Sequence, residues 1–269
     1  MSKAPRARRA LIPTVAAVVC AGVVSVAQAQ PPDFTGVYET YRAPQGQGQG
    51  RASGFGGPRA GLPLTEEGKR RVEEYGVLAG PTRLNGATFC ADYGVPTMMT
   101  LPGAYPIEFI QKPTQLTIIY EVNNETRRIY IGDRQVAPEK RLPSRAGYSS
   151  GHWEGNVLVV KTTDLLDAQD QTGSPYSDQA TIDERFSLAE TDGKKVLTYQ
   201  ATITDPVYYT EPVKLPDRKY QLYDDFIIPY GCQDEIWSEL LDLRRDQLKA
   251  GKPVDARMSD VYKVREARE

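Results

Sequence analysis

The stretch Tyr148-Ser-Ser-Gly-His-Trp-Glu-Gly-Asn-Val-Leu-Val-Val-Lys-Thr-Thr163 predicts a β-hairpin. Gly155-Asn156 supplies turn residues between two runs that are rich in strand-forming side chains. The stretch also holds the only histidine of the chain, His152. One histidine is too few for a histidine-rich zinc site. The hairpin therefore indicates a β-protein with a single candidate for imidazole chemistry.

Strand-like patterns continue on both sides of this hairpin. Polar and apolar residues alternate with a period of two, and Pro113-Thr114, Asn123-Asn124 and Asp192-Gly193 separate neighbouring runs with turn residues. Residues 133–149 form a proline-rich crossing. The further strand-like runs are 107–111, 116–122, 127–131, 181–188, 196–204 and 218–228.

Two segments have helical character, and both lie outside the strand-rich region. Residues 64–75 predict a short exposed helix with Thr65 as its N-cap, and residues 234–250 place apolar side chains at near-helical spacing. Many short strands in sequence order, with helices at the ends, are typical of an antiparallel meander that closes into a barrel. The fold class we expect is mainly β.

The first 29 residues have the features of a signal peptide. A basic start precedes the apolar run 10–26, and Ala27-Gln28-Ala29 forms an A-x-A cleavage site. The apolar run is too short for a membrane anchor in the mature protein. We therefore expect a periplasmic or secreted protein, cleaved near Ala29. Arg8-Arg9 leaves twin-arginine export open beside general secretion.

The mature chain fits one large β-domain. After the leader, residues 30–40 predict a first strand, and residues 41–63 are rich in Gly and Gln, which predicts a flexible loop. Residues 64–232 form the predicted barrel domain, and residues 233–269 the C-terminal helix and tail.

Charge and cysteine content restrict the partners and the compartment. Of 33 basic and 35 acidic residues, the leader removes four basic ones, which leaves 29 against 35 and a net charge of −6. This balance argues against nucleic acid or anionic lipid as a partner. Cys20 leaves with the leader, so Cys90 and Cys232 remain. An even number in an oxidising compartment favours one disulfide, the alternative being two buried thiols.

Several motifs extend over almost the whole mature chain. They are Phe34-Thr-Gly-Val-Tyr38, Cys90-Ala-Asp-Tyr-Gly-Val-Pro96, Pro106-Ile-Glu-Phe-Ile-Gln111, Tyr120-Glu-Val-Asn-Asn-Glu-Thr-Arg-Arg-Ile-Tyr130, residues 147–160, Pro175-Tyr-Ser-Asp178, Asp205-Pro-Val-Tyr-Tyr209 and Cys232-Gln-Asp234. Together they resemble a family of uncharacterised exported bacterial proteins. The first also resembles the Gly-x-Trp opening of lipocalin and wider calycin barrels, with Tyr38 in place of Trp. The resemblance implies a calycin-like barrel with an aromatic floor, and it brings no established activity.

The chain departs from that family pattern at two positions. Where the pattern has histidine in Gly-His-Ser and Pro-His-Ser, this chain has Tyr148 and Tyr176. Neutral phenols are poor metal ligands, so we expect no metal and no other cofactor. The two tyrosines can act as hydrogen-bond donors or, with a lowered pKa, as acid–base groups. Alternatively, both positions are structural.

Two acids and an arginine form a second candidate group. If Pro113-Thr114 is a two-residue turn, Glu108 lies opposite Ile119, and Glu121 faces the same side about 6 to 8 Å away. If Asn123-Asn124 is a second such turn, Glu121 pairs with Thr126 and Arg128 joins that face. The group would form a polar binding floor or a buried ion network, and a three-residue turn would move Glu121 to the other face.

Two functions from different classes follow. The first is an exported barrel that binds a small apolar or aromatic molecule, with candidate binding residues Tyr120, Arg128, Trp153, Asp164 and Tyr199. The second is a cofactor-free acid–base enzyme, an isomerase, dehydratase or lyase, with candidate catalytic residues Tyr148, His152, Tyr176, Glu108 and Glu121. A purely structural envelope protein is a third possibility, and it predicts a filled barrel.

Overall fold

The structure is a computed structural model that describes residues 30–42, 61–79, 91–100, 105–228, 230 and 235–254. The chain divides into two units, Met1–Gln30 and Pro31–Glu269, and all described helices and strands belong to the second. The leader, most of the predicted flexible loop, and both Cys90 and Cys232 lie outside the described residues. The disulfide therefore stays a prediction.

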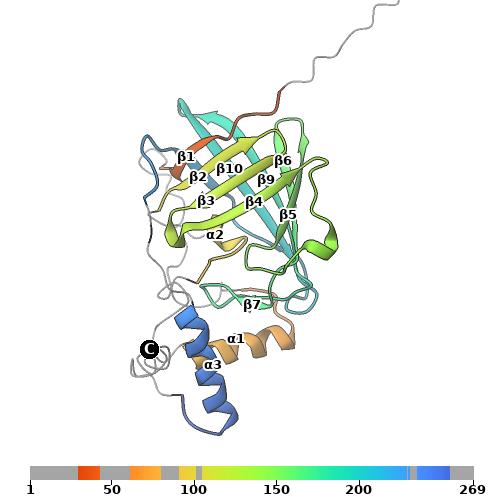
Figure 1. Ribbon diagram of the computed structural model, residues 1–269, viewed down its shortest axis with the longest axis vertical. Coiled ribbons are helices and arrows are strands. Elements are labelled where there is room, and N and C mark those ends of the chain that lie inside the picture. Colours follow the sequence, from red (N-terminus) through yellow and green to blue (C-terminus); the bar gives the residue numbers. More distant parts are fainter. Residues whose placement is uncertain are drawn as a thin grey trace, which may run out of the picture. The chain divides into compact units, whose positions relative to one another are not determined.

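Nine strands of the described chain close into a β-barrel (Figure 1). Neighbours follow the order β12-β1-β2-β3-β4-β5-β6-β9-β10, and β10 pairs with β12 to complete the ring. The barrel strands are β1 (Gly36–Thr40), β2 (Ile107–Lys112), β3 (Gln115–Tyr120), β4 (Glu125–Ile131), β5 (Tyr148–Glu154), β6 (Val157–Thr163), β9 (Thr181–Thr191), β10 (Lys194–Thr204) and β12 (Arg218–Leu222). The mainly β prediction is thus confirmed at the level of a closed barrel.

Three further strands of the described chain lie outside the ring. The strand β11 (Val213–Lys214) pairs with the end of β10, whereas β7 (Ala168–Gln169) and β8 (Pro175–Tyr176) form a separate two-stranded sheet. The strand β7 and the helix α2 both lie at the lower end of the barrel in Figure 1.

The helices are α1 (Glu66–Ala79), α2 (Thr97–Thr100) and α3 (Glu235–Lys249), with 3₁₀ turns at Val122–Asn124 and Pro138–Lys140. Thr65 caps α1, because its Oγ1 accepts a hydrogen bond from the backbone N–H of Gly68 at 3.0 Å. The helices α1 and α3 contact each other, and Arg244 of α3 donates to the carbonyl oxygen of Leu78 at 2.7 Å. Within the described ranges, no helix is long and apolar enough to cross a lipid bilayer.

The predicted hairpins form with the predicted turns. Glu154 pairs with Val157 around Gly155-Asn156, and Thr191 pairs with Lys194 around Asp192-Gly193. Gly155 has a φ of +57° and Gly193 a φ of +70°, values that glycine adopts at little cost. The turn at Pro113-Thr114 also has two residues, so Glu108 lies opposite Ile119 as predicted.

Two features of the predicted meander are wrong. The connection between β3 and β4 has four residues rather than two, because Asn123 and Asn124 adopt positive φ within a 3₁₀ turn. Tyr120 therefore pairs with Glu125, and Glu121 does not pair with Thr126. In addition, β4 and β5 are parallel, since the long crossing between them carries the chain back to the same end of the barrel.

Large side chains fill the barrel interior. One continuous core contains inward-facing side chains from strands all around the ring, and Tyr38, Phe109, Phe186 and Tyr199 are fully buried in it. The rings of Tyr38 and Phe109 meet edge-on with centroids 5.3 Å apart. Tyr38 therefore lies inside the barrel, as the comparison with Gly-x-Trp barrels implies.

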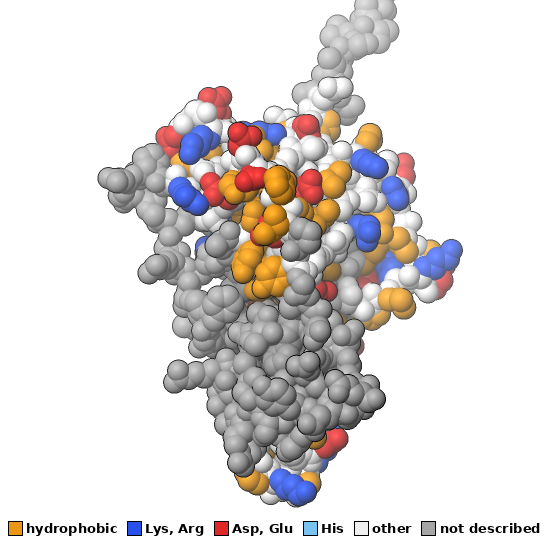
Figure 2. Space-filling view, turned by 60° about the vertical axis from the view of Figure 1, so that its left-hand side comes forward, with side chains coloured by type: hydrophobic (Ala, Val, Ile, Leu, Met, Phe, Trp, Pro, Cys, Tyr) orange, Lys and Arg blue, Asp and Glu red, His pale blue; other side chains and the backbone are white. Residues whose placement is uncertain are grey.

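The exterior is not uniformly polar. The segment that follows β12 exposes Tyr223, Phe226 and Ile228, with Asp224 and Asp225 between them in the sequence. Figure 2 shows hydrophobic side chains gathered on one face, with acidic side chains beside them.

Candidate functional site

A buried ion pair lies inside the barrel. Arg127 on β4 donates through Nη1 to Oε1 of Glu184 on β9 at 2.8 Å, and through Nη2 to Oε2. Ser149 and Thr162 accept the other guanidinium hydrogen bonds, at 2.9 to 3.0 Å. Tyr199 donates its hydroxyl to Glu184 at 2.7 Å. Four strands therefore contribute side chains around one arginine.

The electrostatics of this network are those of a structural pair. Burial alone would lower the pKa of Arg127, but the adjacent Glu184 carboxylate outweighs it and holds that pKa above its ordinary value. Burial, and then the charge of Glu184, raise the pKa of Tyr199 well above its ordinary value. Arg127 and Glu184 are fully enclosed, at 1% and 0% side-chain exposure, so ligand cannot reach them without rearrangement.

One end of the barrel is covered by Ala91–Thr100, here called the end segment, which contains α2 (Figure 1). Met98 and Met99 within it are fully buried, and the hydroxyl of Tyr220 on β12 donates to the carbonyl oxygen of Met99. The backbone N–H of Val95 donates to the carbonyl oxygen of Arg145 at 3.0 Å. The barrel strands and the crossing thus both hold the end segment.

Glu125, the first residue of β4, is the main polar anchor of the end segment. Its two carboxyl oxygens accept the backbone N–H groups of Gly94 at 2.7 Å and Tyr93 at 2.9 Å. Burial, with a smaller contribution from Asp92, raises its pKa to about 8, although those two N–H groups and Arg145 act in the opposite direction. At neutral pH the carboxyl is therefore mostly protonated.

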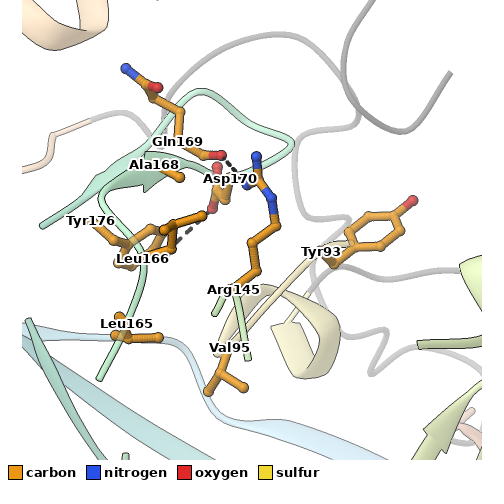
Figure 3. Close-up of a pocket in the computed structure, with 9 residues that line it drawn as sticks. All are labelled: Tyr93, Val95, Arg145, Leu165, Leu166, Ala168, Gln169, Asp170 and Tyr176. Atoms are coloured by element: carbon orange, nitrogen blue, oxygen red, sulfur yellow. Dashed lines mark hydrogen bonds between the residues drawn. The ribbon is translucent and has the colours of Figure 1, made fainter. Parts of the chain in front are cut away.

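A pocket lies between the end segment and the β7–β8 sheet (Figure 3). Its volume is about 20 Å³. Two tyrosine rings and four aliphatic side chains share the lining with one cation, one carboxylate and one amide. The lining residues are Tyr93, Val95, Arg145, Leu165, Leu166, Ala168, Gln169, Asp170 and Tyr176.

Asp170 organises the polar side of this pocket. Its Oδ1 accepts the backbone N–H groups of Thr172 at 2.8 Å and Ser174 at 3.0 Å, and also the Thr172 hydroxyl. Its Oδ2 accepts the hydroxyl of Thr97 at 2.7 Å and that of Tyr176 at 3.3 Å. Asp170 therefore joins α2 of the end segment to the β7–β8 sheet and fixes both walls of the pocket.

The five predicted catalytic residues lie in separate places. Tyr148 bonds Gln135 and the Val136 backbone N–H in the crossing, and His152 is 64% exposed beside Glu154 on the outside of the barrel. Tyr176 is in the pocket. Glu108 is half-buried on the face of β2 opposite to that of the buried Ile107 and Phe109. Glu121 accepts the backbone N–H of Ile228 at 2.9 Å.

The predicted binding residues are also dispersed. Tyr120 and Tyr199 point into the core, where Tyr120 meets Tyr93 with ring centroids 5.8 Å apart. Trp153 stacks on Phe34 at 5.5 Å. Asp164 accepts the hydroxyl of Thr163 at 2.7 Å. Arg128 is exposed, because it shares the outward face of the sheet with Thr126 and Glu108, whereas Arg127 alternates into the core.

Sequence reasoning missed most of the pocket. Arg145, Asp170 and Tyr93 lie in irregular segments, where no periodic pattern indicates which way a side chain points. Only Tyr176 was singled out, through the comparison with the Pro-His-Ser motif. Among the described residues, no three Asp, Glu, His or Cys side chains gather as they would to hold a metal ion.

Comparison with known proteins identified no relative of this chain. No family model matches the chain. Searches of curated proteins and of solved structures found no significant match either. The closed barrel is compatible with a calycin-like fold, but the family suggested by the sequence motifs has no support from these comparisons.

Proposed function

We propose that this is an exported β-barrel protein that binds a small apolar or aromatic molecule at the pocket between the end segment and the β7–β8 sheet. The observation that carries the proposal is the composition of that pocket. Tyrosine and aliphatic side chains line it beside a few convergent polar groups, the combination typical of small-molecule sites. The leader sequence supports export.

The position of the pocket is consistent with a rigid site. Asp170 fixes the two walls by hydrogen bonds, and the filled interior of the barrel provides the scaffold beneath them. The small volume limits what enters to a few atoms, so the rest of the ligand lies against the rim. Leu166 at the rim is 45% exposed and provides apolar surface for it.

The test uses a pocket-filling variant with a matched control. Ala168→Phe blocks the pocket with a side chain larger than the free volume, and Ala189→Phe adds the same ring at an exposed position of β9. Binding of a panel of small aromatic and aliphatic compounds is measured by saturation-transfer NMR, and molecules that copurify are sought by native mass spectrometry. We expect wild type and Ala189→Phe to bind the same compounds and Ala168→Phe to lose them. Equal binding by all three proteins, or by none, would overturn the proposal.

A further inference from the structure

We infer that the ligand of this pocket carries a carboxylate and that Arg145 binds it. The inference rests on the proposed function and adds to it the chemical class of the ligand, a monocarboxylate with an apolar or aromatic body. It depends on the hydrogen bonds of Arg145 and of two acids close to it, Asp170 and Glu125, and on the size of the pocket.

The guanidinium of Arg145 has donors to spare. Within the described part of the chain, its only hydrogen bond is from Nη1 to the carbonyl oxygen of Gln169, at 2.8 Å (Figure 3). An arginine has five N–H donors in a planar fork. Arg145 is half-buried and lines the pocket, so its remaining donors are accessible from there.

The acids near Arg145 do not use these donors. Asp170 lies next to Gln169 and lines the same pocket, yet both of its oxygens accept hydrogen bonds from Thr97, Thr172, Ser174 and Tyr176 instead. Those donors compensate the carboxylate locally. The positive charge of Arg145 is therefore not paired with the acid that shares its pocket.

Glu125 is the second acid near Arg145. Its oxygens accept the backbone N–H groups of Tyr93 and Gly94, and its carboxyl is mostly protonated at neutral pH, so it offers Arg145 little negative charge. An arginine beside two acids, each satisfied by other groups, remains available for an anion from solution. Carboxylates match the planar fork of arginine, because two parallel N–H···O bonds form at once.

The volume of the pocket fits a head group rather than a whole ligand. A cavity needs a volume of about 10–15 Å³ to hold one buried water molecule. The volume of this pocket is about 20 Å³. A carboxylate group therefore fills the pocket, whereas an aromatic ring is too large to enter it. With the head group at Arg145, the apolar body extends across the rim over Leu166, whose side chain is 45% exposed.

The test compares acids with their neutral amides. Benzoate and hexanoate are titrated against benzamide and hexanamide by calorimetry, with wild type and the variants Arg145→Gln and Arg145→Lys. We expect wild type to bind each acid about ten-fold or more tightly than its amide, in line with a charge-assisted bidentate contact. Arg145→Gln should remove this preference by weakening the acids much more than the amides, because the neutral amides gain no charge-assisted pair of hydrogen bonds from the guanidinium. Arg145→Lys should retain only part of it, because lysine lacks the planar fork.

A second variant covers the case in which Arg145→Gln does not fold. Leu166→Asp places a negative charge at the rim, and Leu222→Asp does the same at a barrel position of matched exposure, 46% against 45%. We expect Leu166→Asp to weaken benzoate more than benzamide, and Leu222→Asp to weaken neither.

The outcomes separate the two proposals. If the amides bind as tightly as the acids, and Arg145→Gln binds both as wild type does, the carboxylate inference is overturned while the proposed function stands. If neither acids nor amides bind, and Ala168→Phe changes nothing, both fall. If wild type prefers the acids and Arg145→Gln does not, both the proposed function and the carboxylate inference are supported.

Discussion

Replacing Glu125 by glutamine should change how the stability of the protein depends on pH. The pKa of Glu125 rises from an ordinary 4.5 to about 8 in the folded protein. Below pH 4.5 the carboxyl is protonated in both states and costs nothing. Between pH 4.5 and 8 the unfolded chain releases the proton while the folded protein retains it, so stability falls as pH rises.

The size of the effect follows from the same two pKa values. One pH unit corresponds to about 1.4 kcal/mol, so this group alone lowers the free energy of unfolding by about 5 kcal/mol between pH 4.5 and pH 8. An amide cannot ionise, and the Glu125→Gln variant therefore loses this decline. The amide nitrogen of the new side chain would, however, face the N–H of Tyr93 or Gly94, which costs about 1–3 kcal/mol at every pH.

The order of stability of wild type and Glu125→Gln should therefore reverse between low and high pH. Glu125→Gln should be less stable than wild type at pH 5 and at least as stable at pH 9. Urea unfolding followed by tryptophan fluorescence at several pH values measures this, with Glu190→Gln, an exposed carboxylate on β9, as the control that runs parallel to wild type. A difference between Glu125→Gln and wild type that stays constant within about 1 kcal/mol from pH 5 to 9 would refute the reasoning.

Three other substitutions test the barrel itself. Glu184→Gln leaves Arg127 charged and without its counter-ion in the core, and should lower the free energy of unfolding by about 3–5 kcal/mol in urea. The apolar pair Arg127→Met/Glu184→Leu should recover most of this loss, and a loss below about 1 kcal/mol in the single variant would contradict the prediction. Gly147→Ala should lower Tm clearly more than Gly155→Ala, because both residues have positive φ but only at Gly147 would a Cβ lie 2.5 Å from a backbone oxygen; equal shifts in Tm by calorimetry would show that the close approach is unimportant. His152→Ala should change the free energy of unfolding by less than about 0.5 kcal/mol, since its contact with Glu154 is exposed. A loss above about 1 kcal/mol in urea unfolding would contradict this.

The sequence predicted those parts of the fold that depend on local chemistry. Gly155 and Gly193 stand where the hairpins turn, and the Pro113-Thr114 turn sets the register of β2 and β3. In each case the residues that decide the geometry are within a few positions of one another. Such signals can be read from one chain without knowledge of the core.

The register of β4 could not be predicted in the same way. Asn123-Asn124 is a turn signal, but the turn that forms has four residues, because Asn123 also donates its side-chain amide to the carbonyl oxygen of Ala91 in the end segment. A tertiary contact thus selects the turn. A shift of two positions keeps each side chain on its face, so Arg127 faces the core in either register and Arg128 faces outward. The buried ion pair forms with Glu184, a partner that no local pattern indicates.

The candidate site was the least predictable part. Tyr176 was found through a motif, whereas Arg145 and Asp170 come from irregular chain whose path is set by contacts with the end segment. The interior does contain polar groups, as predicted, and those around Arg127 and Glu184 bond one another, whereas the buried hydroxyl of Tyr38 has no partner among the described residues. The proposed site lies at the end of a filled barrel rather than inside it because of how the core packs, which the alternation of side chains along strands does not reveal.

The pairing of β12 with both β1 and β10 makes the barrel sensitive to the completeness of the chain. Glu39 and Gln221 bond across this seam although 182 positions separate them in the sequence. A chain that stops short of Arg218 leaves β1 and β10 each with unpaired backbone groups along one side, which are templates for association with other chains. The last barrel strand to leave the ribosome is therefore the one that ends the risk of aggregation, and truncated products should be insoluble even though eight of the nine barrel strands are present.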